Sequence, residues 1–162
     1  MEVLRAEAAR DPKVKVVDLA KIGGRHCALM AGFHVTRGEY VVCIDDDLQC
    51  PTERLWDLLA PPWRAAEYDV AIAKYRKKNA ERLQKASAAA FRIGCPTGCW
   101  GKDKELKFSN FSAMRRFVRD EVTRYRNPYP YISGLMLRST SRVVNVEMEE
   151  RERTIGTGPL HV

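Results

Sequence analysis

The sequence lacks long apolar runs. No stretch reaches the roughly 18 to 20 apolar residues that a membrane-spanning helix needs. The N-terminal residues, MEVLRAEAARD, mix charged and apolar positions, so they also lack the apolar centre of a secretory signal. These absences predict a cytoplasmic protein without a membrane span.

Regular cysteine spacing is also missing. The five cysteines, Cys27, Cys43, Cys50, Cys95 and Cys99, are odd in number and irregularly spaced, which argues against a disulfide framework. Cys95 and Cys99 could form half of a zinc site, but no second pair of Cys or His stands at ligand spacing. We therefore expect free thiols, with a zinc site as the less favoured alternative.

The net charge of +7 favours an anionic partner, but no signature of nucleic-acid binding accompanies it. Lys and Arg are spread along the chain without a basic stripe interleaved with aromatic residues, and no zinc-finger or RNA-recognition motif is present. Phosphorylated metabolites and acidic lipid surfaces are therefore favoured as partners. A basic nucleic-acid-binding module is the less favoured alternative.

With 162 residues and 45% hydrophobic content, the chain is long enough for one domain with a core and too short for two. Strands that alternate with helices indicate an α/β sheet. Pro61 and Pro62 are expected to end the helix that precedes them. The pattern predicts helices at 2–10, 25–34, 53–60, 79–93, 115–125 and 132–137, and strands at 14–19, 40–44, 68–73, 108–114 and 143–146.

An acidic run follows the most apolar of these strands. Residues 40–44 are continuously apolar, which is typical of a parallel strand buried on both faces, and Asp45, Asp46 and Asp47 follow directly. Ligands of open α/β sheets bind beyond the carboxyl ends of the strands. Adjacent carboxylates repel one another unless a cation compensates, and hard oxygen ligands favour Mg²⁺ or Mn²⁺, which keep positions open for substrate phosphates. The run therefore predicts a metal-diphosphate site.

The alternative for this run is a solvated turn. In that interpretation Asp47 or Thr52 would cap the helix that follows, as Asp and Thr often do. The residues alone leave both interpretations open.

The stretch VVCIDDDLQCPTE, Val41 to Glu53, resembles the strand and Asp-x-Asp motif of family 2 glycosyltransferases. It is most similar to members that move a sugar from a nucleotide donor to a polyprenyl phosphate. The resemblance extends over nearly the whole chain. Its further segments are residues 5–32 with Gly24, Ala28 and Gly32 in a Gly-x-x-x-Ala-x-x-x-Gly helix, Ser109–Phe111 with Met114–Arg116, and Ile132–Leu135 with residues 143–156.

This resemblance implies the GT-A fold, a Rossmann-like fold of nucleotide-diphospho-sugar transferases. It implies metal-dependent sugar transfer from a nucleotide-diphosphate sugar to a polyprenyl phosphate, another lipid-linked acceptor or a saccharide, with peripheral contact at the cytoplasmic face of a membrane. Asp45 and Asp47 would be the catalytic residues and metal ligands, with Asp47 the principal one. The implied substrate-binding residues are Asp45, Asp46, Gln49, Lys21, Asn110, Arg153 and Gly156.

Two segments of the family are absent from the sequence. They are a strand ending in Pro-x-Tyr-Asn-Glu and a strand ending in Asp-Asp-Gly-Ser, which build the middle of the sheet and hold the nucleotide base. Residues 1–162 are therefore expected to form a single partial catalytic domain that lacks the first two strands and is truncated at both ends. Exposed strand edges should make the isolated chain prone to aggregation.

Single positions also depart from the family. Ile22 replaces a common Asn, Asn110 replaces Asp or Ser, and Ser112 replaces a frequent Arg, so no catalytic base is assigned. Arg153 falls where the family carries a phosphate-contacting Arg, but a solvated residue in a charge run is an equal alternative. The main alternative to an active enzyme is an inactive remnant that acts as a binding piece.

Overall fold

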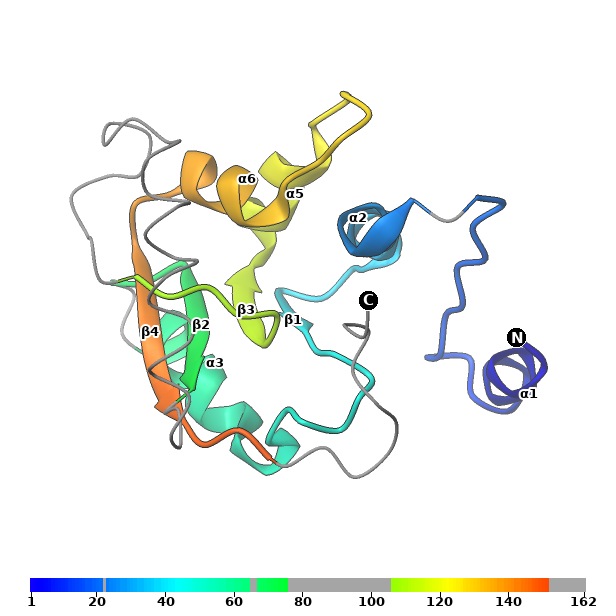
Figure 1. Ribbon diagram of the computed structural model, residues 1–162, viewed down its shortest axis with the longest axis horizontal. Helices are drawn as coiled ribbons and strands as arrows, with labels where there is room; N and C mark the ends of the chain where they lie inside the picture. Colours follow the sequence, from blue (N-terminus) through cyan, green and yellow to red (C-terminus); the bar gives the residue numbers. More distant parts are fainter. Residues whose placement is uncertain (22, 65–66, 76–105, 152–162) are drawn as a thin grey trace, which may run out of the picture.

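The computed structural model describes residues 1–21, 23–64, 67–75 and 106–151 (Figure 1). Its elements are α1 (Glu2–Arg10), α2 (Gly24–Val35), β1 (Tyr40–Cys43), the short 3-10 helix η1 (Thr52–Arg54), α3 (Leu55–Arg64), β2 (Val70–Tyr75), β3 (Ser112–Arg115), α5 (Arg116–Thr123), α6 (Ile132–Ser139) and β4 (Val143–Met148). The strands form one sheet in the order β1-β3-β2-β4. β3 is antiparallel to both of its neighbours, and β2 is parallel to β4, so the sheet is mixed.

Helices cover both faces of this sheet. Because successive side chains of a strand point to opposite faces, Val70 and Ile72 of β2 join one core cluster and Ala71 and Ala73 join the other. The first cluster is closed by residues of α2, α5 and α6, and the second by Leu58 of α3 together with Cys50 and Phe111. The described part of the chain is thus a helix-sheet-helix sandwich (Figure 1).

Most of the elements predicted from the sequence are confirmed, with small shifts of their bounds. The predicted strand at 108–114 begins only at Ser112, and the predicted helix at 79–93 lies outside the described residues, as do Cys95 and Cys99. The expected helix end at Pro61-Pro62 is wrong, because α3 continues to Arg64. The fixed φ of proline, about −65°, is compatible with a helix, so the chain loses two amide donors there without leaving the helical path.

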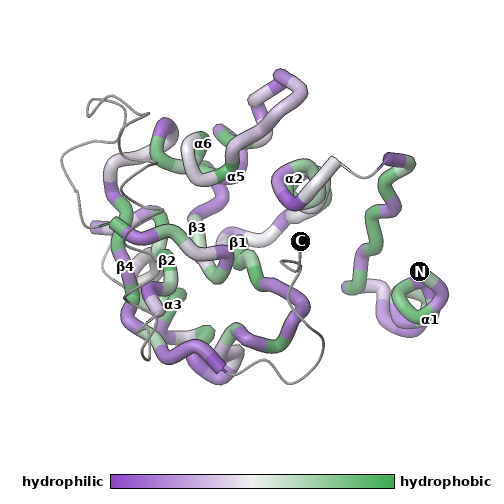
Figure 2. The backbone as a smooth tube through the Cα atoms, viewed as in Figure 1, coloured by the Kyte–Doolittle hydropathy of each residue, from purple (hydrophilic) through white to green (hydrophobic). Residues whose placement is uncertain are grey.

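Two predictions about strands are wrong. Residues 40–44 were expected to form a parallel strand, but within the described residues β1 pairs with β3 alone, and antiparallel. Residues 14–19 are extended without forming a strand, because no described segment lies beside them to complete a ladder. α1 and this segment stand apart from the sheet, beyond α2 (Figures 1 and 2).

An open groove runs along the free edge of β1. It has a volume of about 610 Å³ and lies between Tyr40–Val42 on one side and Val17 and Leu19 on the other, with α2 beside it. Val17 and Leu19 are 40% and 42% exposed there. Within the described residues, the edge of β1 beside the groove has no neighbouring strand.

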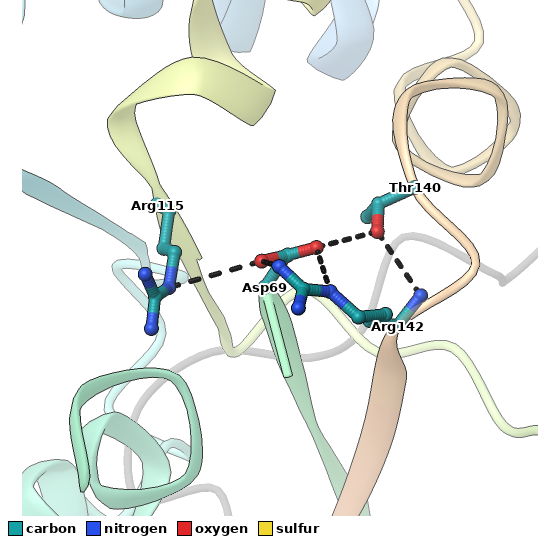
Figure 3. A network of polar contacts seen from close by, with 4 residues as sticks. All are labelled: Asp69, Arg115, Thr140 and Arg142. Atoms are coloured by element: carbon teal, nitrogen blue, oxygen red, sulfur yellow. Dashed lines mark hydrogen bonds and ion pairs between the residues drawn. The ribbon is translucent and has the colours of Figure 1, made fainter. Parts of the chain in front are cut away.

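A buried carboxylate, that of Asp69, holds the strands together where β2 begins (Figure 3). Asp69, just before β2, is 2% exposed, and its carboxylate accepts hydrogen bonds from Arg142 Nε at 2.8 Å, Arg142 Nη2 at 2.6 Å and Thr140 Oγ1 at 2.6 Å. Arg115 Nε, at the end of β3, lies 3.8 Å from Asp69 Oδ1. Burial alone would raise the pKa of the Asp69 carboxyl, but the hydrogen bonds from Arg142 and Thr140 and the charges of Arg142 and Arg115 outweigh it, so the pKa is lowered.

Replacing Asp69 with Asn should lower the free energy of unfolding by about 2–4 kcal/mol, because it leaves a buried amide among cationic donors that require a carboxylate. Thermal or urea unfolding followed by circular dichroism measures this loss. Asp57→Asn, which breaks the exposed pair between Arg54 of η1 and Asp57 of α3, is the matched control and should cost less than about 0.5 kcal/mol. Equal effects of the two variants would contradict the role of Asp69.

The Asp69 carboxylate should also make the folded state less stable as the pH falls. Since the folded-state pKa of Asp69 is lowered, its contribution is complete above the unfolded value of about 3.9 and is lost as pH falls through the lower folded value. Asp69→Asn should therefore flatten the decline in stability below about pH 4. Parallel acid-unfolding curves for the two proteins would argue against this.

The open edge of β1 should make the chain associate through strand pairing. The double variant Val17→Lys with Leu19→Lys places charges on the groove wall and should increase the monomer fraction in size-exclusion chromatography with light scattering. Val3→Lys with Leu4→Lys, on the exposed face of α1, adds the same charge away from the edge and should leave the fraction unchanged. A wild-type chain that is monomeric and melts in one sharp transition would contradict the prediction.

Candidate functional site

The acidic run forms a tight loop directly after β1. Asp47 Oδ1 accepts a hydrogen bond from the backbone N–H of Gln49 at 3.1 Å, an Asx turn that brings Leu48 to a φ of 63°. A positive φ at a leucine costs on the order of 1 kcal/mol, so the surrounding contacts must hold it. One of these contacts is the backbone N–H of Arg151, which donates to Gln49 O at 3.1 Å and ties the loop to the segment after β4.

Asp45 is held from two other segments. β1 and β3 pair with Cys43 opposite Ser112, and continuing this antiparallel register by two residues places Asn110 opposite Asp45. Asn110 Nδ2 donates to Asp45 Oδ2 at 2.8 Å, and Arg25 Nη2, in the first turn of α2, lies 3.4 Å from Asp45 Oδ1. Both oxygens of this carboxylate therefore already have partners.

A tyrosine at the end of β2 completes the surroundings of the loop. The Tyr75 hydroxyl donates to Sγ of the buried Cys50 at 3.6 Å. Burial, the hydrogen bond to Cys50 and the negative charges of Glu150 and Asp45 raise the pKa of Tyr75 above its ordinary value. Burial also raises the pKa of the Cys43 thiol to about 11; a hydrogen bond with Ser112 opposes this rise, and the charge of Asp45 adds to it.

Both pKa shifts arise first from burial, and the negative charge of Asp45 adds to each of them. Tyr75 and Cys43 stay protonated at neutral pH, so neither supplies a base or a thiolate nucleophile there. The tyrosine hydroxyl is a hydrogen-bond donor in this environment.

The three aspartates do not gather into one cluster. Among the residues that the structure describes, no group of three or more His, Cys, Asp or Glu side chains is placed to hold a metal. Asp46 is exposed, while Asp45 and Asp47 are partly buried. A bound cation was expected to offset their mutual repulsion. In the structure, Arg25, Asn110 and the backbone N–H of Gln49 offset part of it.

The donor set nevertheless fits a phosphate-bound divalent ion. Mg²⁺ in such sites takes only one or two protein carboxylates and fills its other positions with phosphate oxygens and water. Asp45 and Asp47 provide two carboxylates in one loop, and Gln49 adds an amide to the same loop. The alternative of helix capping is wrong, because η1 begins after Pro51 without a side-chain cap and Asp47 bonds Gln49 instead.

The remaining predicted residues fall outside this constellation. Lys21 is exposed in the segment that precedes α2. Arg153 and Gly156 lie outside the described residues.

No helix within residues 1–21, 23–64, 67–75 and 106–151 has both the length and the apolar character to cross a bilayer.

Sequence reasoning missed Arg25 and Tyr75. Tyr75 could have been found, because it lies two residues beyond the predicted strand at 68–73, at the edge of the sheet where Asp45 lies. Arg25 carried no such signal, since its approach to Asp45 depends on how α2 packs beside the sheet.

A mixed sheet with helices on both faces and an Asp-x-Asp loop at the carboxyl end of a strand is the arrangement of an incomplete GT-A fold. Residues 2–138 match the family model described as Glycosyl transferase family 2, so the chain belongs to that family.

Its relatives include a Bacillus subtilis protein described as an uncharacterized glycosyltransferase, YkcC, at 30% identity over 156 residues, which is 96% of this chain and 48% of the relative. An undecaprenyl-phosphate 4-deoxy-4-formamido-L-arabinose transferase of Pseudomonas fluorescens is 28% identical over 93% of this chain and 44% of its own length.

The fold is also similar to that of a solved structure. Glucosyl-3-phosphoglycerate synthase of Mycobacterium tuberculosis, in complex with Mn²⁺, UDP and phosphoglyceric acid, aligns with a TM-score of 0.50 and 22% identity over 90% of this chain and 50% of the other. The chain thus spans about half the length of the relatives it matches.

Proposed function

We propose that this chain is part of the catalytic domain of a glycosyltransferase that takes its sugar from a nucleotide-diphosphate donor. The observation that carries the proposal is the loop of Asp45 to Asp47 at the carboxyl end of β1, with Asp45 fixed by Asn110 in a chain of glycosyl transferase family 2. A lipid phosphate such as a polyprenyl phosphate is the proposed acceptor, with a saccharide as the alternative.

The relatives support each part of this proposal. Several are described as undecaprenyl-phosphate transferases, which favours a polyprenyl phosphate acceptor. The solved relative holds Mn²⁺ with UDP, which favours a divalent ion at the donor site. The net charge of +7 suits substrates that carry phosphates and peripheral contact with an acidic membrane surface at its cytoplasmic side.

Asp47 and Asp45 are the residues that would hold Mg²⁺ or Mn²⁺. When bound, such an ion supplies electrostatic stabilisation of the negative charge on the departing nucleotide diphosphate. Asn110 orients the Asp45 carboxylate by its hydrogen bond, and the Asx turn of Asp47 sets the path of the loop. Asp46, Gln49 and Lys21 remain candidate donor-binding residues, together with Arg153 and Gly156.

A phosphate acceptor lowers the demand for a catalytic base. Its oxygen is already a nucleophile, so the transfer needs positioning and charge stabilisation more than proton abstraction. This agrees with a site whose tyrosine and thiol are both held in their neutral forms.

A second candidate function is a non-catalytic binding piece. The groove of about 610 Å³ along β1 favours it, because it leaves exposed apolar residues, Val17 and Leu19, beside the sheet edge. In that case the acidic loop binds a metal without a nucleotide sugar. Membership of a glycosyltransferase family leaves little support for the nucleic-acid-binding alternative.

Asp47→Ala should weaken the Mn²⁺-dependent binding of a UDP-sugar by at least about tenfold, since the loss of even an outer partner of a metal ligand typically costs 10–100-fold in affinity. Isothermal titration calorimetry with and without Mn²⁺ measures the change. Asp57→Ala, on the exposed surface of α3, is the control and should bind as the wild type does.

The outcomes of this titration separate the candidates. Unchanged affinity in Asp47→Ala, with an unchanged melting temperature, would refute the assignment of the loop. Mn²⁺ binding by the wild type without any nucleotide-sugar binding would support the binding piece. Steeply salt-dependent binding to oligonucleotides would favour the basic module instead.

A further inference from the structure

Arg25 and Asp45 form an ion pair inside the proposed donor site. Arg25 Nη2 lies 3.4 Å from Asp45 Oδ1, and Asn110 occupies the other carboxylate oxygen at 2.8 Å. Each of these oxygens keeps a second lone pair, so a metal would bind Asp45 beside these two partners. Of these two partners, only Arg25 carries a charge that opposes a metal cation directly.

The two partners of Asp45 differ in how firmly they are held. The Arg25 side chain is 56% exposed, whereas that of Asp45 is 26% exposed. Ion pairs with such exposure contribute little to stability, so this one is easily exchanged. Asn110 is instead fixed by its place opposite Asp45 in the register of β1 and β3.

A diphosphate is a natural alternative partner for Arg25. A guanidinium binds phosphate oxygens in bidentate fashion, and phosphate groups carry more charge than one carboxylate. A diphosphate at this loop would attract Arg25 away from Asp45, whereas a metal arriving alone would meet the positive charge of Arg25 beside that carboxylate.

We infer that Arg25 is an internal counter-cation of the acidic loop, which opposes binding of a divalent metal alone and makes the metal and the nucleotide diphosphate bind together. This inference rests on the proposed function, because it concerns the same donor site. In thermodynamic terms, Arg25 creates positive coupling between the two ligands, and the coupling is reciprocal.

The test is a thermodynamic cycle with Mn²⁺ and UDP on the full 162-residue chain. Free Mn²⁺ measured by electron paramagnetic resonance gives the Mn²⁺ affinity with and without UDP, for the wild type, Arg25→Gln and Arg25→Lys. Arg25→Gln should raise the affinity for Mn²⁺ alone by about three- to tenfold, as expected for removing a like charge a few ångströms away near a surface. It should also reduce the factor by which UDP raises Mn²⁺ affinity.

Arg25→Lys keeps the charge and should restore most of the wild-type coupling. Arg5→Gln breaks a more exposed Arg–Asp pair, between α1 and Asp18, away from the site, and should change neither affinity. Melting temperatures of all variants identify any loss of folding. A purely structural role for Arg25 predicts a weaker Mn²⁺ affinity in Arg25→Gln, opposite in direction to the inference.

The outcomes distinguish this inference from the proposed function. If the wild type fails to bind Mn²⁺ and UDP even together, both are overturned. If the wild type binds the pair but Arg25→Gln binds Mn²⁺ alone no more tightly than the wild type, only the role of Arg25 is overturned. A higher Mn²⁺ affinity that persists in Arg25→Lys would also overturn it, because the charge would then be irrelevant.

Discussion

The pairing of β3 between β1 and β2 is the constraint on which the rest of the structure depends. β3 is antiparallel to both neighbours, so it joins the strand that carries the acidic loop to the strand that ends in Tyr75. Its side chains alternate between the two core clusters, with Met114 in one and Ala113 in the other. Without this strand the described sheet would separate into β1 and the β2-β4 pair.

The same pairing builds the candidate site. The register of β1 and β3 brings Asn110 to Asp45, although 64 positions lie between them in the sequence. The Asp69 network fastens the other end of β2 to β3 and β4, which fixes the frame against which the loop is placed. Asp69 lies at the end of the sheet where β2 begins, and the acidic loop lies at the end where β1 stops. The two polar ends enclose an apolar middle.

Each carboxylate of the acidic loop either has a partner within the chain or faces solvent. Asp45 is paired with Arg25, Asp47 accepts a backbone N–H, and Asp46 is left to solvent. An acidic loop therefore does not require a metal in order to fold, and a metal would bind beside partners already present. The sheet itself ends in an open groove beside β1, where the apolar residues Val17 and Leu19 are exposed.

Local sequence determined several parts of this protein without help from tertiary structure. The helical periodicity of α1, α2 and α6, the apolar run of β1 and the three aspartates that follow it are all local signals. Family membership rests on a match over residues 2–138, which include the stretch Val41 to Glu53. Such features are readable because they depend on neighbours within one or two turns or along one strand.

Tertiary structure alone decided that β1 pairs with β3, that residues 14–19 do not form a strand and that Arg25 approaches Asp45. A buried apolar strand reads the same whether its neighbour is parallel or antiparallel, and a strand pattern becomes a strand only where another segment completes its hydrogen bonds. The contacts of Asp45 depend on register and helix packing between distant segments, so no single stretch of sequence encodes them.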